Sequence, residues 1–200
     1  GYFDSLGKLT PFSVRNPDLE YRHIGFAMHF SQPECIKPSQ NPTDEDAYWH
    51  LVRTKSCPFF STALLIGVLL WGGSAETAVY IKQFGDLYGE TIQIHDDLND
   101  TMAVPASPDW ILGRSPLPIL YSLVFDHPDK AKFLELRQAI PDPVALTEAQ
   151  TILVRCGAVS YCIDQLIRRY HTARTIIETM PSRNKEGLED LLEDVINPVR

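Results

Sequence analysis

The clearest pattern in the sequence is a run of apolar and polar positions with helical spacing over residues 75–102. The run contains no proline, and Ser74 precedes it as a suitable N-cap residue. Gly72 and Gly73 come directly before this serine and predict the end of an earlier, apolar helix over residues 58–71. The pattern therefore predicts two successive helices joined by a glycine turn.

A shorter helix is expected before these two. Thr43 is a suitable N-cap, and the three residues after it are acidic, as the dipole of a helix favours in its first turn. This helix should extend to about Lys55, and Pro58 marks either a kink or the first turn of the next helix. Residues 31–43 carry three prolines and are expected to form an irregular loop.

The C-terminal half follows the same helical pattern after a loop over residues 103–116, which is rich in proline. Further helices are expected within residues 116–125, 126–140, 147–180 (long, amphipathic and capped by Thr147) and 184–199. Strand signals are nearly absent, because no alternating β-branched run lies between turn dipeptides. The predicted fold class is all-α, in one domain over residues 1–200 that we expect to be incomplete at its N-terminus.

Composition and charge narrow the classes of function. The net charge of −8 argues against non-specific binding to nucleic acids or anionic membranes, which requires basic patches. The longest apolar run, residues 57–73, is too short for a membrane span, and we interpret it as a buried helix. No two cysteines form a CxxC pair, so we expect reduced core thiols in a cytoplasmic protein at Cys35, Cys57, Cys156 and Cys162.

One face of the expected helix over residues 75–102 carries residues that are unusual for a core-facing stripe. Its members, spaced 4, 4, 3 and 4 apart, are Gly85, Gly89, Gln93, Asp96 and Asp100. Asp96 and Asp100, one turn apart, repel each other unless a cation lies between them. Mg²⁺ prefers oxygen ligands and is often held by one or two carboxylates together with substrate phosphates and water. The stripe therefore indicates a magnesium site, with Asp97 at the same end of the helix.

The residues alone leave a second interpretation open, in which the acids are a solvated helix end. The glycines of the stripe likewise allow the close approach of either a ligand or a neighbouring helix. Other conspicuous residues have ordinary interpretations. We expect His95 to be a packing or surface residue, Arg168 and Arg169 to lie on a solvated helix face, and three tryptophans to be core residues: Trp49, Trp71 and Trp110.

The stretch FGDLYGETIQIHDDLND resembles the second aspartate-rich motif of the trans-polyprenyl diphosphate synthases, the family of farnesyl and geranylgeranyl diphosphate synthases. That motif reads G-x-x-x-Q-x-x-D-D-x-x-D, and its fixed places are filled by Gly89, Gln93, Asp96, Asp97 and Asp100. Upstream, LVRTKSCPFF resembles the family's Lys-Thr segment, with Lys55 in place and serine where threonine is usual. Gln32 falls near the family's Gly-Gln segment, and in GRSPLPILYSL Arg114 replaces the lysine of a Gly-Lys-x-x-x-Pro segment.

The resemblance implies a bundle of long helices around a central pocket, in a protein that is commonly a homodimer. It implies that Mg²⁺ binds the diphosphate of an allylic isoprenoid, and that isopentenyl diphosphate or another acceptor attacks the allylic cation. The stretch FFSTALLIGVLL would then line the pocket that holds the isoprenoid tail. The implied roles are metal binding by Asp96, Asp97 and Asp100, diphosphate binding by Lys55, Arg114 and Gln32, and a place beside the reacting carbons for Gln93.

The sequence departs from the family in two respects. It has no first D-D-x-x-D motif, so we expect a fragment or a chain whose earlier part is missing, and one that is inactive alone. The loop before Arg114 is shorter than usual, which leaves the acceptor open, a peptide tryptophan included. Three alternatives therefore remain: a class I terpene cyclase with the same metal chemistry, a non-catalytic partner subunit, and an HD-type phosphohydrolase that uses His95 and Asp96.

Overall fold

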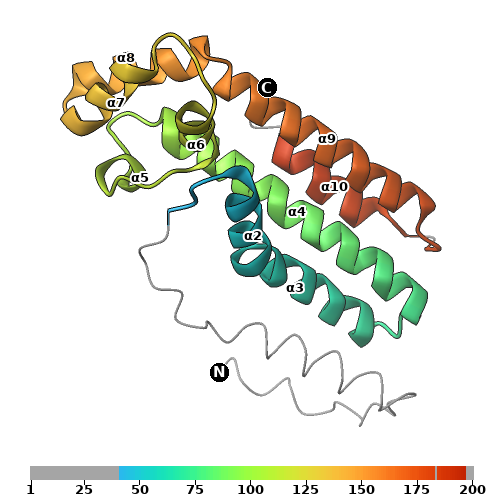
Figure 1. The fold of residues 1–200 in the computed structure, drawn as a ribbon. Coiled ribbons are helices and arrows are strands. Elements are labelled where there is room, and N and C mark those ends of the chain that lie inside the picture. Colours follow the sequence, from blue (N-terminus) through green and yellow to red (C-terminus); the bar gives the residue numbers. More distant parts are fainter. Residues whose placement is uncertain (1–40, 183, 197–200) are drawn as a thin grey trace, which may run out of the picture.

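The computed structural model describes residues 41–182 and 184–196, and these form helices and connecting turns with no strand among them (Figure 1). The predicted all-α class is therefore confirmed. In chain order the helices are α2 (Glu45–Lys55), α3 (Cys57–Leu70), α4 (Ala75–Met102), α5 (Pro108–Ile111), α6 (Leu117–Val124), α7 (Lys130–Ala139), α8 (Pro143–Arg155), α9 (Ala158–Thr179) and α10 (Glu186–Ile196). The expected loop over residues 31–43 lies almost entirely outside the described residues.

Helix α4 is the central element of the bundle. It packs against α3 on one side and against α9 on the other, and it also contacts α2, α5, α6 and α10. Helices α5 to α8 gather at the C-terminal end of α4 (Figure 1). The expected bounds of α4 agree with the structure, and Ser74 caps it as predicted by accepting a hydrogen bond from the backbone amide of Thr77.

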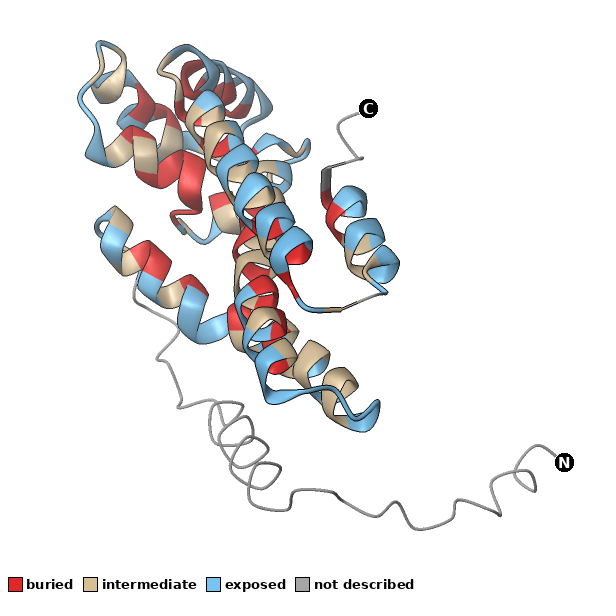
Figure 2. Cartoon of the chain, turned by 90° about the vertical axis from the view of Figure 1, so that its right-hand side faces the viewer, coloured by how far each residue is buried: buried red, intermediate tan, exposed pale blue. Residues whose placement is uncertain are grey.

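Within the described residues, three apolar clusters follow the inward faces of the helices, where the buried positions of Figure 2 lie. The first contains residues of five helices, α5, α6, α7, α8 and α9, and lies around Phe133 and Leu153. The second joins α2, α3, α4, α6 and α9 around Ile94. The third joins α4, α9 and α10 around Phe84 and Ile177. Helix α4 contributes to two of these clusters, and four of its polar residues are buried: Glu90, Thr91, Asp97 and Thr101.

The prediction that α3 is a buried helix was wrong. Only Cys57 and Ser61 are buried in it, whereas Leu70 is 72% exposed and Trp71, at its end, is 92% exposed. The reason is that α3 packs mainly against α4, so only one face is covered by the described residues. Trp71 is therefore not a core residue, while Trp49 and Trp110 are buried as expected. Pro58 lies in the first turn of α3, one of the two places expected for it.

Two predicted helix starts and one predicted long helix were also wrong. Asp44, not Thr43, caps α2, because its side chain accepts from the backbone amide of Ala47. The expected helix over residues 147–180 is two helices, α8 and α9, divided at Gly157, whose φ of 87° is a left-handed conformation that favours glycine. Asp142 caps α8 in place of Thr147.

Residues 103–116, expected to be a loop, contain the short helix α5. Trp110 of α5 donates from its indole to the carbonyl oxygen of Thr101 at 2.9 Å, and Gln150 of α8 donates to the same oxygen. The C-terminal end of α4 is thus held by buried side chains. Among the described residues, no helix combines the length and the apolar character that crossing a lipid bilayer requires.

Candidate functional site

The two glycines of the α4 stripe serve the contact between α3 and α4. A β-carbon built on Gly85 would lie 2.5 Å from the Cα of Ser61, and one on Gly89 would lie 2.8 Å from the Cα of Cys57. Neither distance is compatible with a side chain, so the glycines allow the two helix backbones to approach closely. Of the two possibilities left open by the sequence, the neighbouring helix is the one observed.

Gln93 connects α4 to the junction between α2 and α3. The hydroxyl of Ser56 donates to Gln93 Oε1 at 2.7 Å, and Gln93 Nε2 donates to Asp97 Oδ1 at 2.8 Å. The side-chain amide therefore has a partner at each end. Lys55 precedes Ser56 in the last turn of α2 and is exposed, so the contact holds the backbone next to Lys55 at a defined distance from the acidic motif.

Asp97 is directed into the protein. Its side chain is 5% exposed, and Oδ2 accepts from the hydroxyl of Tyr48 at 2.8 Å and from the backbone amide of Leu117 at 2.7 Å. Burial raises the pKa of Asp97 to about 6, while the hydrogen bonds from Leu117, Gln93 and Tyr48 oppose that rise. Burial, with the nearby charge of Asp97, also raises the pKa of Tyr48. Asp97 thus joins α4 to α2 and to the start of α6.

Asp96 and Asp100 lie on the other side of the helix and are exposed. Among the described residues, no hydrogen bond or ion pair is made by either carboxylate. Partial burial raises the pKa of Asp96; its electrostatic interaction with His95 lowers this pKa, and the negative charge of Asp100 raises it. His95 itself is half-buried and contacts Asn99 through Nδ1, in agreement with the packing or surface role expected for it.

The three carboxylates of the motif can be compared with the ligands that Mg²⁺ usually has in proteins. Within residues 41–182 and 184–196, no three His, Cys, Asp or Glu side chains are arranged to hold a metal ion. Mg²⁺ does not require such a cage, because it commonly binds one or two carboxylates and completes its octahedron with water and substrate phosphates. Two exposed carboxylates one helical turn apart fit that mode, whereas Asp97, already occupied by three protein donors, does not.

Hydrogen bonds from α7 hold the loop that precedes α6. Arg137 of α7 donates to the carbonyl oxygens of Gly113 and Arg114, both at 2.7 Å, and burial lowers the pKa of its guanidinium. The side chain of Arg114 is exposed and forms an ion pair with Asp109 at 3.1 Å. Leu117, which donates to Asp97, follows three residues after Arg114, so Arg114 lies in the segment that leads to this contact. Gln32 lies outside the described residues.

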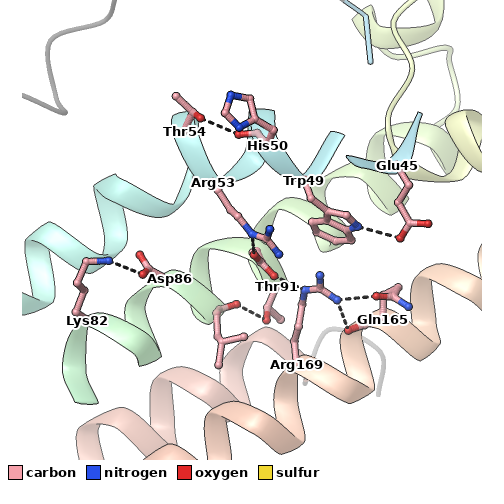
Figure 3. Close-up of polar contacts among 12 residues, drawn as sticks. Glu45, Trp49, His50, Arg53, Thr54, Lys82, Asp86, Thr91, Gln165 and Arg169 are labelled. Carbon is pink, nitrogen blue, oxygen red and sulfur yellow. Dashed lines mark hydrogen bonds and ion pairs between the residues drawn. The ribbon is translucent and has the colours of Figure 1, made fainter. Parts of the chain in front are cut away.

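An ion-pair cluster around the buried carboxylate of Glu90 lies beside this site and was missed by the sequence analysis. Glu90 of α4 accepts from Arg53 Nε at 2.8 Å and from Arg169 Nε at 2.7 Å. Arg169 lies 3.8 Å over the ring of Trp49, and Figure 3 shows Arg53 and Arg169 directed into the space between α2, α4 and α9. The expectation that Arg169 lies on a solvated face was wrong, since only 12% of its side chain is exposed. No sequence signal marks Glu90 as paired.

No protein-family model matches the sequence. Two curated proteins do. A short chain isoprenyl diphosphate synthase of Methanothermobacter thermautotrophicus is 21% identical over 159 residues, which are 76% of this chain and 49% of that protein. A geranylgeranyl diphosphate synthase of Methanosarcina mazei is 34% identical over 70 residues, 35% of this chain and 20% of that protein. The chain spans about half the length of the first of these relatives.

The fold agrees with these relationships. A crystal structure of geranylgeranyl pyrophosphate synthase from Corynebacterium glutamicum, in complex with calcium and isoprenyl diphosphate, superposes with a TM-score of 0.72. It is 23% identical, and the match covers 90% of this chain and 58% of that one. The described helices thus have the all-α fold of the isoprenyl diphosphate synthases. Together with the sequence matches, this fold shows that the chain is similar to the isoprenyl diphosphate synthases, in agreement with the resemblance of its aspartate-rich motif.

Proposed function

We infer that this chain carries part of the active site of a magnesium-dependent prenyltransferase. The observation that supports this most directly is a pair of exposed carboxylates on α4. These are Asp96 and Asp100, which lie one helical turn apart and C-terminal to Gln93. The relatives are named as isoprenyl and geranylgeranyl diphosphate synthases, and one solved neighbour is in complex with calcium and isoprenyl diphosphate. The activity of the whole protein is part of the proposal, because this chain covers only part of each relative.

In this proposal, Asp96 and Asp100 hold Mg²⁺, and the bound ion would supply charge neutralisation of an allylic diphosphate as it leaves. Lys55 and Arg114 contact diphosphate oxygens; Arg114 can do so with two parallel hydrogen bonds once it releases Asp109. Gln32 is assigned the same task from the resemblance alone. Gln93 lies beside the reacting carbons, with its amide direction set by Ser56 and Asp97.

The apolar face of α3 has a place in the same proposal. Phe59, Ile66 and Leu70 are exposed on it, and the helix contains no charged residue. Such a surface can cover an isoprenoid tail and keep water away from an allylic cation. The acceptor is isopentenyl diphosphate or another nucleophile, and we expect a cytoplasmic homodimer.

The test is to incubate the full-length protein with Mg²⁺, labelled isopentenyl diphosphate and allylic diphosphates of several lengths. Elongated products support the proposal. Cyclised products formed from the allylic diphosphate alone indicate a class I terpene cyclase. Substrates left untouched in the presence of a folded, magnesium-saturated protein contradict an enzymatic role and favour a non-catalytic partner subunit.

A further inference from the structure

Asp97 differs from the other two acids of the motif in where it points. Successive residues of an α-helix are rotated by about 100°, so Asp97 cannot face the direction shared by Asp96 and Asp100. Its carboxylate is buried, and its three hydrogen-bond donors come from three helices: Gln93 of α4, Tyr48 of α2 and the first residue of α6, Leu117. Asp97 is thus fully engaged inside the protein.

Recruiting Asp97 to a cation would require these bonds to break. The hydroxyl of Tyr48 and the backbone amide of Leu117 would then remain as buried donors with no acceptor among the described residues, which is unfavourable. The amide of Leu117 is also at the N-terminus of α6, where a carboxylate is favoured by the helix dipole. The position of Asp97 is therefore determined by the protein rather than by a ligand.

An ionised carboxylate accepts hydrogen bonds and donates none, and this determines the direction of Gln93. The glutamine must present its NH₂ group to Asp97 and its oxygen to the hydroxyl of Ser56, which is the arrangement observed. Asp97 thereby acts, through Gln93, on the side chain of Ser56, the residue that follows Lys55. It also fixes the start of α6, three residues after Arg114.

We propose that Asp97 is a positioning residue, which joins α4 to α2 and to the start of α6 and fixes the amide of Gln93. Asp96 and Asp100 then bind the cation without a contribution from Asp97. This claim about cation binding depends on the proposed function, whereas the positioning role of Asp97 does not. This division of labour departs from the metal role that the resemblance implies for all three aspartates.

The first experiment measures the affinity of the full-length protein for Mn²⁺ by electron paramagnetic resonance, in the wild type and in single variants. Asp97→Asn keeps an acceptor for Tyr48 and Leu117, so it should fold and bind Mn²⁺ with unchanged affinity. Asp96→Asn, the matched control one residue away, should lose most of the binding. An equal loss in the two variants would overturn the proposal.

The second experiment follows the side-chain amide signals of Gln93 by NMR in the absence of metal. Asp97→Asn places an NH₂ group opposite Gln93, which forces the glutamine amide to turn over, so its signals should shift strongly. Asp96→Asn should leave them in place. Signals that shift no more in Asp97→Asn than in Asp96→Asn would refute the positioning role, whatever the Mn²⁺ result.

The two experiments separate this proposal from the proposed function. A wild-type protein that binds no Mn²⁺ contradicts the cation site, but the Gln93 signals still decide the role of Asp97. Should Asp97→Asn fail to fold, Tyr48→Phe removes a single donor. That variant should move the Gln93 signals and lower Tm by about 2–5 °C, with Mn²⁺ affinity unchanged; a fall in affinity to the level of Asp96→Asn would overturn the proposal.

Discussion

Arg169 Nε lies 2.7 Å from Glu90 Oε2, and this contact joins α9 to the middle of α4. Glu90 also receives Arg53 from α2, so one buried carboxylate holds three helices together. The guanidinium of Arg169 lies over Trp49, which adds a cation–π contact in a place with little access to water. The cluster sets the spacing of the helices that carry Lys55 and the acidic motif.

Replacing Glu90 by glutamine should destabilise the fold. The variant keeps the shape of the side chain but leaves Arg169 as a buried charge without its counterion, at a cost of about 3–5 kcal/mol. The free energy of unfolding from urea denaturation, followed by circular dichroism, measures this. Arg168→Ala is the matched control, since Arg168 is exposed and paired only within its own helix. Equal midpoints for the wild type and Glu90→Gln would show that the cluster contributes nothing.

The close packing of α3 on α4 predicts opposite effects of the same substitution at two glycines. Gly85→Ala should lower the free energy of unfolding by about 1–3 kcal/mol, because its methyl group meets the backbone of Ser61. Gly67→Ala should raise it by about 0.5–1 kcal/mol, because a methyl group there meets no atom within 4 Å and alanine favours the helix. Thermal unfolding of the two variants checks the order. A Gly85→Ala variant as stable as Gly67→Ala would contradict the observed helix crossing.

Arg137 should control the mobility of the segment that carries Arg114. Arg137→Ala removes the donors to the carbonyl oxygens of Gly113 and Arg114, so amide hydrogen exchange over residues 103–116 should accelerate. Lys132→Ala, on the same helix and half-exposed, is the control and should leave the exchange unchanged. Protection that is retained in Arg137→Ala would mean that the loop is held by other contacts.

The thiols should differ in reactivity. Burial raises the pKa of Cys57 to about 12 and also raises the pKa of Cys162, so neither is a thiolate at pH 8 in the folded protein. Cys156 is only half-buried. Brief alkylation at pH 8 followed by mass spectrometry should modify Cys156 and leave the two buried thiols intact until the protein is unfolded. Rapid labelling of Cys57 in the native state would contradict its burial.

The sequence predicted the central helix and its stripe well, because these depend on local pattern. Ser74, the glycine turn before it and the absence of proline determine the bounds of α4 directly. The position of Gln93 on the stripe was predicted from its spacing, although its hydrogen-bond partner Ser56 was not. The break at Gly157 was missed, since helical spacing continues on both sides of it and only the positive φ divides the two helices.

The parts that could not be predicted depend on contacts between distant segments. Asp97 faces inward because the start of α6, twenty positions later, supplies a backbone amide that no sequence pattern locates. Arg169 is buried because Glu90 and Trp49 come from other helices. The exposure of α3 was missed for the opposite reason: an apolar composition indicates a covered helix, but the described residues cover one face only.

The central claim, a prenyltransferase site that depends on the exposed carboxylates of α4, is tested most directly by turnover of the full-length protein with Mg²⁺, an allylic diphosphate and isopentenyl diphosphate. Asp96→Ala should reduce product formation by about a thousandfold or more, as expected for loss of a metal ligand that stabilises the leaving diphosphate, with unchanged helix content by circular dichroism. Turnover equal to that of the wild type would contradict the claim.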